Sequence, residues 1–351
     1  MAAVSRTLPR HHYEQGEILE ALEAYWADQH YNADRLRRFF QNVEVGSRHL
    51  ALPLERYGEL DGFGAKNDAF IEAATDLGAR AITEALEAAN LEPRDVDAIF
   101  FTTITGIATP SIDARIVNAL GLRRDVKRTP MFGLGCVGGA AGLARMTDYL
   151  LAFPEHVAVL LSVELCSLTL QPRDFSVKNL IASGLFGDGA AAVVGVGARH
   201  AACDACSGPR IVATRSSFFP DTQWVMGWEI DGDGFEVVLS AELPALIRRD
   251  LRPEVDAFLA DHDLSRGAVD VWVMHPGGPA VLDAIADAMA VGADAFGITW
   301  DSLASVGNLS SASVLFVLGD TIDAGVAEPG DHGLLMAMGP GFCAEQVLLR
   351  W

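Results

Sequence analysis

The sequence predicts a layered α/β fold built from two similar halves. Strand-like runs alternate with helix-like runs along most of the chain, which is typical of layered α/β proteins. Cys136 and Asn308 each stand just before an apolar helical segment, at an offset of 172 residues (308 − 136). The segments Leu91–Thr103 and Leu264–His275 resemble each other at an offset of 173 residues (264 − 91). Two landmarks at nearly the same offset indicate that one α/β unit occurs twice.

The first half is expected to begin with helices and to continue as alternating strands and helices. Apolar residues recur at three- and four-residue spacing in the helical segments, and Asn90 and Pro93 end the third of them. The expected helices are Gly16–Ala27, Ala33–Phe40, Ala69–Ala89, Ser111–Leu120 and Gly138–Leu151. The expected strands, the third of them almost wholly apolar as buried strands are, are Val96–Thr103, Thr129–Phe132, Val157–Val163 and Ala190–Val196.

A segment without periodicity, Gly197–Pro209, predicts the boundary between the halves, which we place at residues 1–200 and 208–351. The second half repeats the alternation. Its expected helices are Glu242–His262, Ala280–Met289 and Gly307–Ile322. Its expected strands are Asp270–His275, Gly333–Met338 and Ala344–Leu349.

The composition indicates a folded, acidic protein. Half of the 351 residues are hydrophobic, which is enough for a large core and argues against disorder. The formal net charge of −21 disfavours nucleic acid and anionic membrane surfaces as partners. An anionic substrate would therefore need a local basic patch.

Cysteine usage and the lack of apolar runs predict a cytoplasmic protein. Five cysteines are typical of free thiols in a reducing compartment rather than of a disulfide framework. Residues 1–15 contain no apolar signal core, and no apolar run is long enough for a membrane span.

Cys136 is the first candidate for chemistry. A thiol at a helix N-terminus lies at the positive end of the helix dipole, which favours the nucleophilic thiolate. The small residues after it let the backbone and a ligand approach closely. The alternative is that Cys136 is a small buried hydrophobe, as free cysteines often are.

His275 and Asn308 complete a candidate set. His275 ends a strand, where a side chain can enter an active-site crevice, although a structural histidine is the alternative. Asn308 could equally be a helix N-cap. If the halves pack around a pseudo-twofold axis, both residues meet Cys136. A Cys/His/Asn set fits acyl transfer through a thioester, with His and Asn as donors to a developing oxyanion.

The other motifs predict no cofactor and no metal. Cys203 and Cys206 form a CxxC pair, but no second pair completes a zinc site, so we interpret them as loop cysteines. The sequence has no Walker motif, no dinucleotide fingerprint and no cluster of metal ligands.

Six segments carry a family resemblance: Gly133–Gly139, Val163–Thr169, Leu185–Gly189, His275–Pro279, Gly307–Ala312 and Gly339–Phe342. Together they resemble the type III polyketide synthases, the chalcone synthase superfamily, and most of all its bacterial alkylpyrone and alkylresorcinol synthases. The resemblance extends from about Arg35 to the C-terminus. It implies a thiolase-like αβαβα layered fold in a homodimer.

The resemblance also implies roles for the three polar residues. Cys136 would take a long-chain starter acyl group from acyl-CoA and hold the growing chain. His275 and Asn308 would bind the malonyl-CoA thioester carbonyl and stabilise the enolate left by decarboxylation. His275 would also hold Cys136 as a thiolate. The products expected from this resemblance are alkylpyrones or alkylresorcinols.

Further residues acquire binding roles from the same resemblance. Phe186 would be the gatekeeper between the CoA tunnel and the cavity, and Thr109 would reach into the cavity of the partner subunit. Val237 stands where plant enzymes have a second phenylalanine, which would leave room for a long acyl group. The remaining residues expected to line the substrate site are Cys166, Thr169, Gly339, Pro340 and Gly341.

Arg35 and Arg38 match family positions that hold the phosphates of CoA, and they would supply the local basic patch. The third basic position of the family is Asn42 in this chain. The alternative for the arginines is a solvated helix face.

Three other functions compete with this interpretation. A β-ketoacyl synthase III would share the fold and the Cys/His/Asn set, but in that family Gln-Ala-Asn usually follows the histidine, whereas Pro-Gly-Gly-Pro follows His275. A hydrolase with the same three residues and a non-catalytic acyl-CoA-binding protein are the other two.

Overall fold

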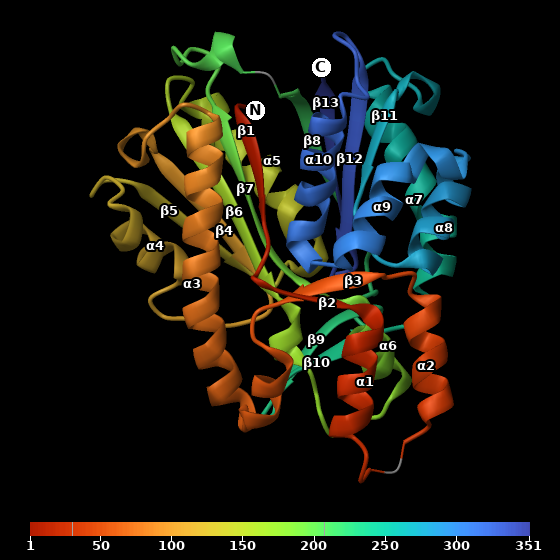
Figure 1. Cartoon of the computed structure of the whole chain (residues 1–351). Helices are drawn as coiled ribbons and strands as arrows, with labels where there is room; N and C mark the ends of the chain where they lie inside the picture. Colours follow the sequence, from red (N-terminus) through yellow and green to blue (C-terminus); the bar gives the residue numbers. More distant parts are fainter. Residues whose placement is uncertain (30, 207) are drawn as a thin grey trace.

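Two β-sheets, each covered by helices on both faces, form the body of the protein (Figure 1). The computed structural model describes residues 1–29, 31–206 and 208–351. The first sheet has the strand order β1-β7-β6-β4-β5, and the second has the order β11-β12-β13-β8. The strands of the first sheet are β1 (Ala3–Thr7), β4 (Ala98–Thr103), β5 (Lys127–Phe132), β6 (Val157–Leu165) and β7 (Asp188–Val196). Those of the second are β8 (Arg210–Phe218), β11 (Val271–Met274), β12 (His332–Gly339) and β13 (Cys343–Arg350).

The helices of the body form three layers that alternate with the sheets. The outer layer on the first sheet is α3 (Gly62–Ala88) with α4 (Ile112–Leu120). The central layer between the sheets is α5 (Gly138–Ala152) with α10 (Ser313–Ala324). The outer layer on the second sheet is α7 (Leu243–Ala260) with α8 (Pro279–Met289), and α9 (Gly297–Val306) lies next to α10.

The alternation of side chains along a strand explains why β4 is buried on both faces. Ile99 and Phe101 pack with the outer helices of the first sheet, and Ala98 and Phe100 pack with the central helices. Strands covered on both faces are apolar without interruption, which is the pattern that predicted them.

Close packing of the central helices depends on glycine. A Cβ added at Gly139 would lie 2.2 Å from the carbonyl oxygen of Ser311, and one at Gly142 would lie 2.4 Å from Leu160 Cδ1. Gly139 therefore brings α5 against the 3-10 turn before α10, and Gly142 brings it against β6.

A smaller region covers the lower end of the sheets in Figure 1. It contains α1 (Gln15–Tyr25), α2 (Ala33–Asn42), α6 (Val177–Leu185) and two hairpins, β2 (His11–Glu14) with β3 (Ser47–Leu50) and β9 (Met226–Asp231) with β10 (Gly234–Leu239). Trp26 and Leu36 are fully buried in its core. Among the described residues, no helix is long and apolar enough to cross a membrane.

Most of the expected elements are confirmed with shifts of a few residues, and two kinds of error remain. The expected helix Gly307–Ile322 is wrong at its start, because α10 begins at Ser313 after a 3-10 turn over Ser310–Ala312. The short or amphipathic elements were not predicted: β1, β2, β3, β8, β9, β10, α6 and α9. Several of them are partly exposed and lack a long apolar pattern.

Candidate active site

Cys136 lies in a tight turn between β5 and α5. A 3-10 helix, Gly135–Val137, connects the two elements, and Gly135 has a φ of +57°. A Cβ at Gly135 would lie 2.7 Å from Pro340 Cδ, so the loop after β12 packs directly on this turn. The expected segment Gly339-Pro340-Gly341 is therefore beside Cys136.

Ser310 connects Cys136 with Asn308. Its hydroxyl oxygen lies 3.8 Å from the Cys136 sulfur, and its main-chain N–H donates to Asn308 Oδ1 at 2.8 Å. Ser313 Oγ also donates to the same amide oxygen at 3.5 Å. Because the oxygen is held in this way, the hydrogen bonds of the described residues leave the Asn308 NH2 group available for a ligand.

His275 follows β11 at the edge of the same region. Its main-chain N–H donates to Met336 O at 3.0 Å, which extends the pairing of β11 with β12. The side chain is buried, and Nδ1 has no hydrogen-bond partner among the described residues. The turn after it approaches Leu185, whose carbonyl oxygen accepts the main-chain N–H of Asn308 at 2.9 Å.

Burial makes both Cys136 and His275 neutral in the free protein. It raises the pKa of the Cys136 thiol to about 12, while the hydroxyl of Ser310 opposes this rise. It lowers the pKa of His275 to about 3. A helix N-terminus contributes about 0.3–1 kcal/mol at exposed sites, less than the several kcal/mol that desolvation of an ion requires. The helix dipole alone therefore does not produce the expected thiolate.

Glu164 is a buried acid below the candidate site. Its carboxylate accepts hydrogen bonds from Ile104 N at 3.0 Å, from Thr105 Oγ1 at 2.9 Å and from Ser311 Oγ. Burial raises its pKa to about 7, against the effect of these donors. The sequence contains Glu164 inside one of the family segments, but no local pattern distinguished it from its neighbours.

Phe186 and Asn308 belong to opposite halves and form an isolated parallel β-bridge. Gly187 N donates to Asn308 O at 3.0 Å. The buried guanidinium of Arg48 supports this bridge, because its Nη1 donates to Phe186 O and to Ser183 O, both at 2.8 Å. Sequence reasoning missed Arg48, which stands in a short strand without any motif.

An apolar cavity starts at Phe186 and runs below α1. It contains about 1020 Å³ of space, part of it open to solvent, and most of its wall is apolar. Three other expected residues, Cys166, Thr169 and Val237, line it. The structure therefore brings these four expected cavity residues together.

Trp228 is a neighbour of Val237 that sequence reasoning did not include. The two residues are paired across the β9–β10 hairpin, and both line the cavity. The Trp228 ring lies 6.4 Å from the Phe186 ring, centroid to centroid. An indole therefore occupies part of the room that valine was expected to leave. No sequence pattern indicates this neighbour, because the hairpin itself was not predicted.

The remaining expected residues lie outside this cavity. Arg35 and Arg38 are exposed on α2, where Arg35 lies over the Phe39 ring at 5.4 Å and Arg38 donates to Asp34 O. Thr109 is exposed on the loop between β4 and α4. Cys203, of the CxxC pair, begins a 3-10 turn between the two sheets.

Family models match both halves of the chain. The model for the N-terminal domain of chalcone and stilbene synthases matches residues 3–199, and the model for their C-terminal domain matches residues 210–351. The chain belongs to this family of type III polyketide synthases. Its relatives are acyltransferases that catalyse decarboxylative Claisen condensation, and this chain is an acyltransferase of the same kind.

Individual relatives cover the whole chain. A 1,3,6,8-tetrahydroxynaphthalene synthase of Streptomyces peucetius subsp. caesius is 49% identical over 100% of this chain and 93% of its own length. A putative chalcone synthase of Bacillus subtilis is 36% identical over 99% of this chain and 98% of its own.

Solved structures agree with this assignment. The tetrahydroxynaphthalene synthase of Streptomyces coelicolor superimposes with a TM-score of 0.93 at 32% identity, covering 100% of this chain and 98% of its own. Germicidin synthase of the same species gives a TM-score of 0.89 at 26% identity, with the same coverage. The fold of this synthase is thus the expected thiolase-like αβαβα arrangement of two halves.

Proposed function

We propose that this synthase loads a starter acyl group on Cys136 and extends it with malonyl units held by His275 and Asn308. The observation that carries this proposal is the contact of Ser310 with both Cys136 and Asn308, because it ties the nucleophile to an amide donor. In this proposal, the neutral imidazole of His275 accepts the thiol proton as the sulfur attacks the thioester. The bond from the acyl carbon to the CoA sulfur then breaks, and the departing CoA thiolate takes up that proton.

The extension step needs no strong base. Loss of carbon dioxide from the malonyl thioester leaves an enolate, and its oxygen would receive hydrogen bonds from the Asn308 amide and the His275 ring. Donors of this kind, placed in advance, lower a barrier by about 3–4 kcal/mol each. The carbon nucleophile then attacks the acyl group on Cys136 and releases the thiolate.

For the product we propose a small hydroxylated aromatic made from malonyl units, of the tetrahydroxynaphthalene type. Two observations support this choice over the alkylpyrones and alkylresorcinols expected from the sequence. Relatives that share the full length carry that name, and Trp228 narrows the cavity at Phe186.

Long-chain starters are the second candidate. The apolar cavity below α1 favours them, because its wall is lined by hydrophobic side chains from α1, including Ile18 and Leu22. An alkyl chain buried there would gain about 0.8 kcal/mol for each CH₂ group. Such starters would lead to alkylpyrones or alkylresorcinols.

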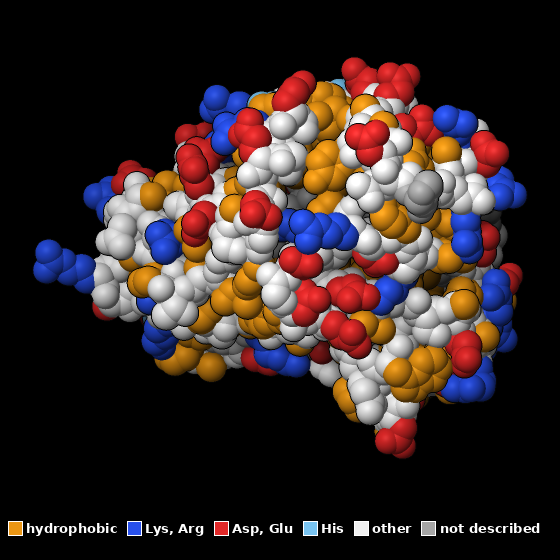
Figure 2. Space-filling model, turned by 90° about the horizontal axis from the view of Figure 1, so that it is seen from below, with side chains coloured by type: hydrophobic (Ala, Val, Ile, Leu, Met, Phe, Trp, Pro, Cys, Tyr) orange, Lys and Arg blue, Asp and Glu red, His pale blue; other side chains and the backbone are white. Residues whose placement is uncertain are grey.

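We propose that CoA enters along α2. Arg35 and Arg38 are exposed there and can pair with phosphates. A second hollow, next to the apolar cavity, is lined instead by carboxylates, among them Asp61, Asp231 and Asp233. Acidic side chains gather near the middle of that face (Figure 2), and they would repel the phosphates of CoA.

We further propose that two copies pair along β5. This strand is the edge of the first sheet and is exposed along most of its length. Unpaired edge strands bind other strands unless they are covered, and Phe132 and Ile107 expose 50% and 41% of their surface nearby. In such a dimer Thr109 could reach the partner. Light scattering of wild type and Phe132→Asp tests this, and a monomeric wild type would contradict it.

Incubation with malonyl-CoA, alone and with dodecanoyl-CoA, tests the function. We expect an acyl adduct on wild type by intact-mass measurement and aromatic products from malonyl-CoA alone. Cys136→Ala should form neither. One 3-ketoacyl product would instead indicate a single condensation, free acid would indicate hydrolysis, and unchanged thioesters would indicate binding only.

A further inference from the structure

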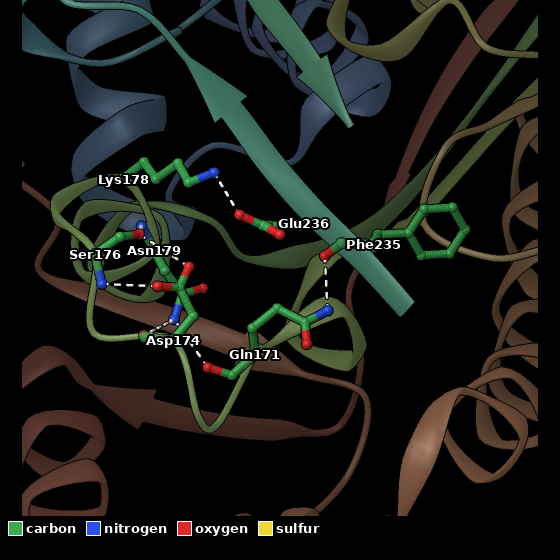
Figure 3. A network of polar contacts seen from close by, with 7 residues as sticks. All are labelled: Gln171, Asp174, Ser176, Lys178, Asn179, Phe235 and Glu236. Carbon is green, nitrogen blue, oxygen red and sulfur yellow. Dashed lines mark hydrogen bonds and ion pairs between the residues drawn. The ribbon is translucent and has the colours of Figure 1, made fainter. Parts of the chain in front are cut away.

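Two buried side chains from different elements converge on the turn of the β9–β10 hairpin. Lys66 Nζ, from α3, donates to Asp233 O at 3.1 Å and to Leu170 O at 2.9 Å. Gln171 Nε2 donates to Phe235 O at 2.9 Å (Figure 3). The same atom also donates to Asp233 O at 3.4 Å. Lys66 and Gln171 expose only 9% and 7% of their surface. Their donors therefore satisfy main-chain carbonyls that would otherwise be unpaired.

The hairpin needs such attachments because it is a sheet of its own. β9 pairs with β10 alone, and the described main-chain hydrogen bonds of these strands join them to each other. The turn is closed internally, since Asp231 Oδ1 accepts the N–H groups of Asp233 and Gly234. Gly234 has a φ of +119°, and a Cβ there would lie 3.5 Å from Gln171 Nε2. The side chain of Gln171 thus packs on the tip of the hairpin.

A row of aromatic rings connects this tip to the gate of the cavity. Phe235 packs edge-on against Phe63 at 5.4 Å and against Trp228 at 6.2 Å between centroids. Trp228 in turn lies 6.4 Å from Phe186. Because Trp228 and Val237 form part of the cavity wall, the position of the hairpin sets the width of the cavity.

Gln171 is itself fixed relative to the gate. Asn179 Nδ2, on α6, donates to Gln171 O at 2.9 Å and to Asp174 O at 2.7 Å (Figure 3). The same helix ends next to Phe186. The same network of hydrogen bonds therefore holds the hairpin tip and the helix that ends next to Phe186, the proposed gatekeeper.

We propose that Lys66 and Gln171 are positioning residues that hold the hairpin wall inward and thereby select short starters over long ones. This inference rests on the proposed function. Neither residue touches the reacting atoms in it. Loss of either clamp should let Trp228 move outward and admit longer acyl groups, while loading and decarboxylation continue.

The test compares starters in Lys66→Met and Gln171→Glu. The second change keeps the side-chain volume and removes the N–H donors. We expect the ratio of kcat/KM for dodecanoyl-CoA to that for malonyl-CoA to rise about tenfold, the scale at which pockets discriminate single methylene groups. The change should lie in the KM for dodecanoyl-CoA. Lys66→Arg keeps a cationic donor, so the ratio in this variant should stay at the wild-type value.

Two further variants serve as the negative and the positive control for this comparison. Lys178→Met removes a partly exposed ion pair with Glu236 on the same hairpin (Figure 3), and such pairs contribute little, so its ratio should stay within about twofold of wild type. Trp228→Ala opens the wall directly and should raise the ratio at least as much as the clamp variants.

An unchanged ratio in the folded variants would overturn the inference, and so would an equal loss of kcat/KM for both starters. If Lys66→Met does not fold, Gln171→Glu decides alone. A wild type that neither loads Cys136 nor decarboxylates malonyl-CoA would refute the proposed function instead. An active wild type with insensitive variants would refute only the clamp.

Discussion

Phe186 and Asn308 are joined by a parallel β-bridge, although they come from opposite halves of the chain. The bridge requires glycine on both sides: a Cβ at Gly187 would lie 2.4 Å from Val306 O, and one at Gly307 would lie 2.8 Å from Leu185 O. Phe186 and Asn308, the proposed gatekeeper and the proposed amide donor, are therefore held by the same backbone contact.

Gly187→Ala should separate the two backbone segments that form this bridge. The added methyl group meets main-chain oxygen, which a side-chain rotation cannot relieve, and overpacking of this kind destabilises by about 1–3 kcal/mol. We expect a lower midpoint in urea unfolding together with reduced malonyl decarboxylation. Gly16→Ala is the matched control, because a Cβ there meets nothing within 4 Å. Equal behaviour of the two variants would contradict this account.

Asn308→Asp should impair decarboxylation more than starter loading. Aspartate keeps the oxygen that accepts the Ser310 N–H, replaces the NH2 donor by an acceptor oxygen, and when ionised adds a negative charge that also disfavours the enolate. Release of carbon dioxide from malonyl-CoA should fall about 10²–10³-fold, the usual effect of one lost oxyanion donor. Acylation of Cys136, followed by intact mass, should fall much less. A parallel loss of both steps would remove Asn308 from its proposed role.

His275→Ala should change how the reactivity of Cys136 depends on pH. Burial raises the pKa of this thiol to about 12, so an isolated thiol reacts faster with each step in pH up to pH 10. In wild type the imidazole can take the proton, and we expect alkylation by iodoacetamide to level off at a lower pH. Peptide mass spectrometry distinguishes Cys136 from the other four cysteines. Identical profiles would show that His275 does not accept the proton.

The central layers of the fold were predictable from the sequence because they are apolar and periodic. β4, β6 and α5 follow from patterns that need no knowledge of the partner segment. The β9–β10 hairpin was not predictable in this way, since half of the residues of β9 are exposed and its turn, Asp231-Gly232-Asp233-Gly234, resembles a loop.

The residues of the candidate site also divide into those that the sequence predicts and those that only the structure shows. Cys136, His275 and Asn308 stand in recognisable turns at the ends of strands and helices. Trp228, Arg48 and Gln171 act through segments distant in sequence, and only the folded chain shows which neighbours they have. The burial of Cys136 and His275, which raises the pKa of the thiol and lowers that of the imidazole, could not be read from the sequence either.

Glu164→Gln should make the protein more stable than wild type above neutral pH. Burial raises the pKa of Glu164 to about 7 from an ordinary value of 4.5, so the folded state holds its proton more tightly than the unfolded state does. Wild-type stability therefore decreases as pH rises from about 4.5 through 7, and the contribution of this one group amounts to about 3 kcal/mol. Glutamine carries no charge and can still accept the hydrogen bond from Ile104 N.

Urea unfolding of both proteins at pH 5 and pH 8 measures this difference. The free energy of unfolding of the variant, relative to wild type, should increase by about 2.5 kcal/mol between the two pH values, because only the wild type must ionise a buried carboxyl group. Glu87→Gln, at an exposed position on α3, should show no such increase. A difference that stays constant with pH would mean that Glu164 ionises equally easily in both states, in spite of its burial.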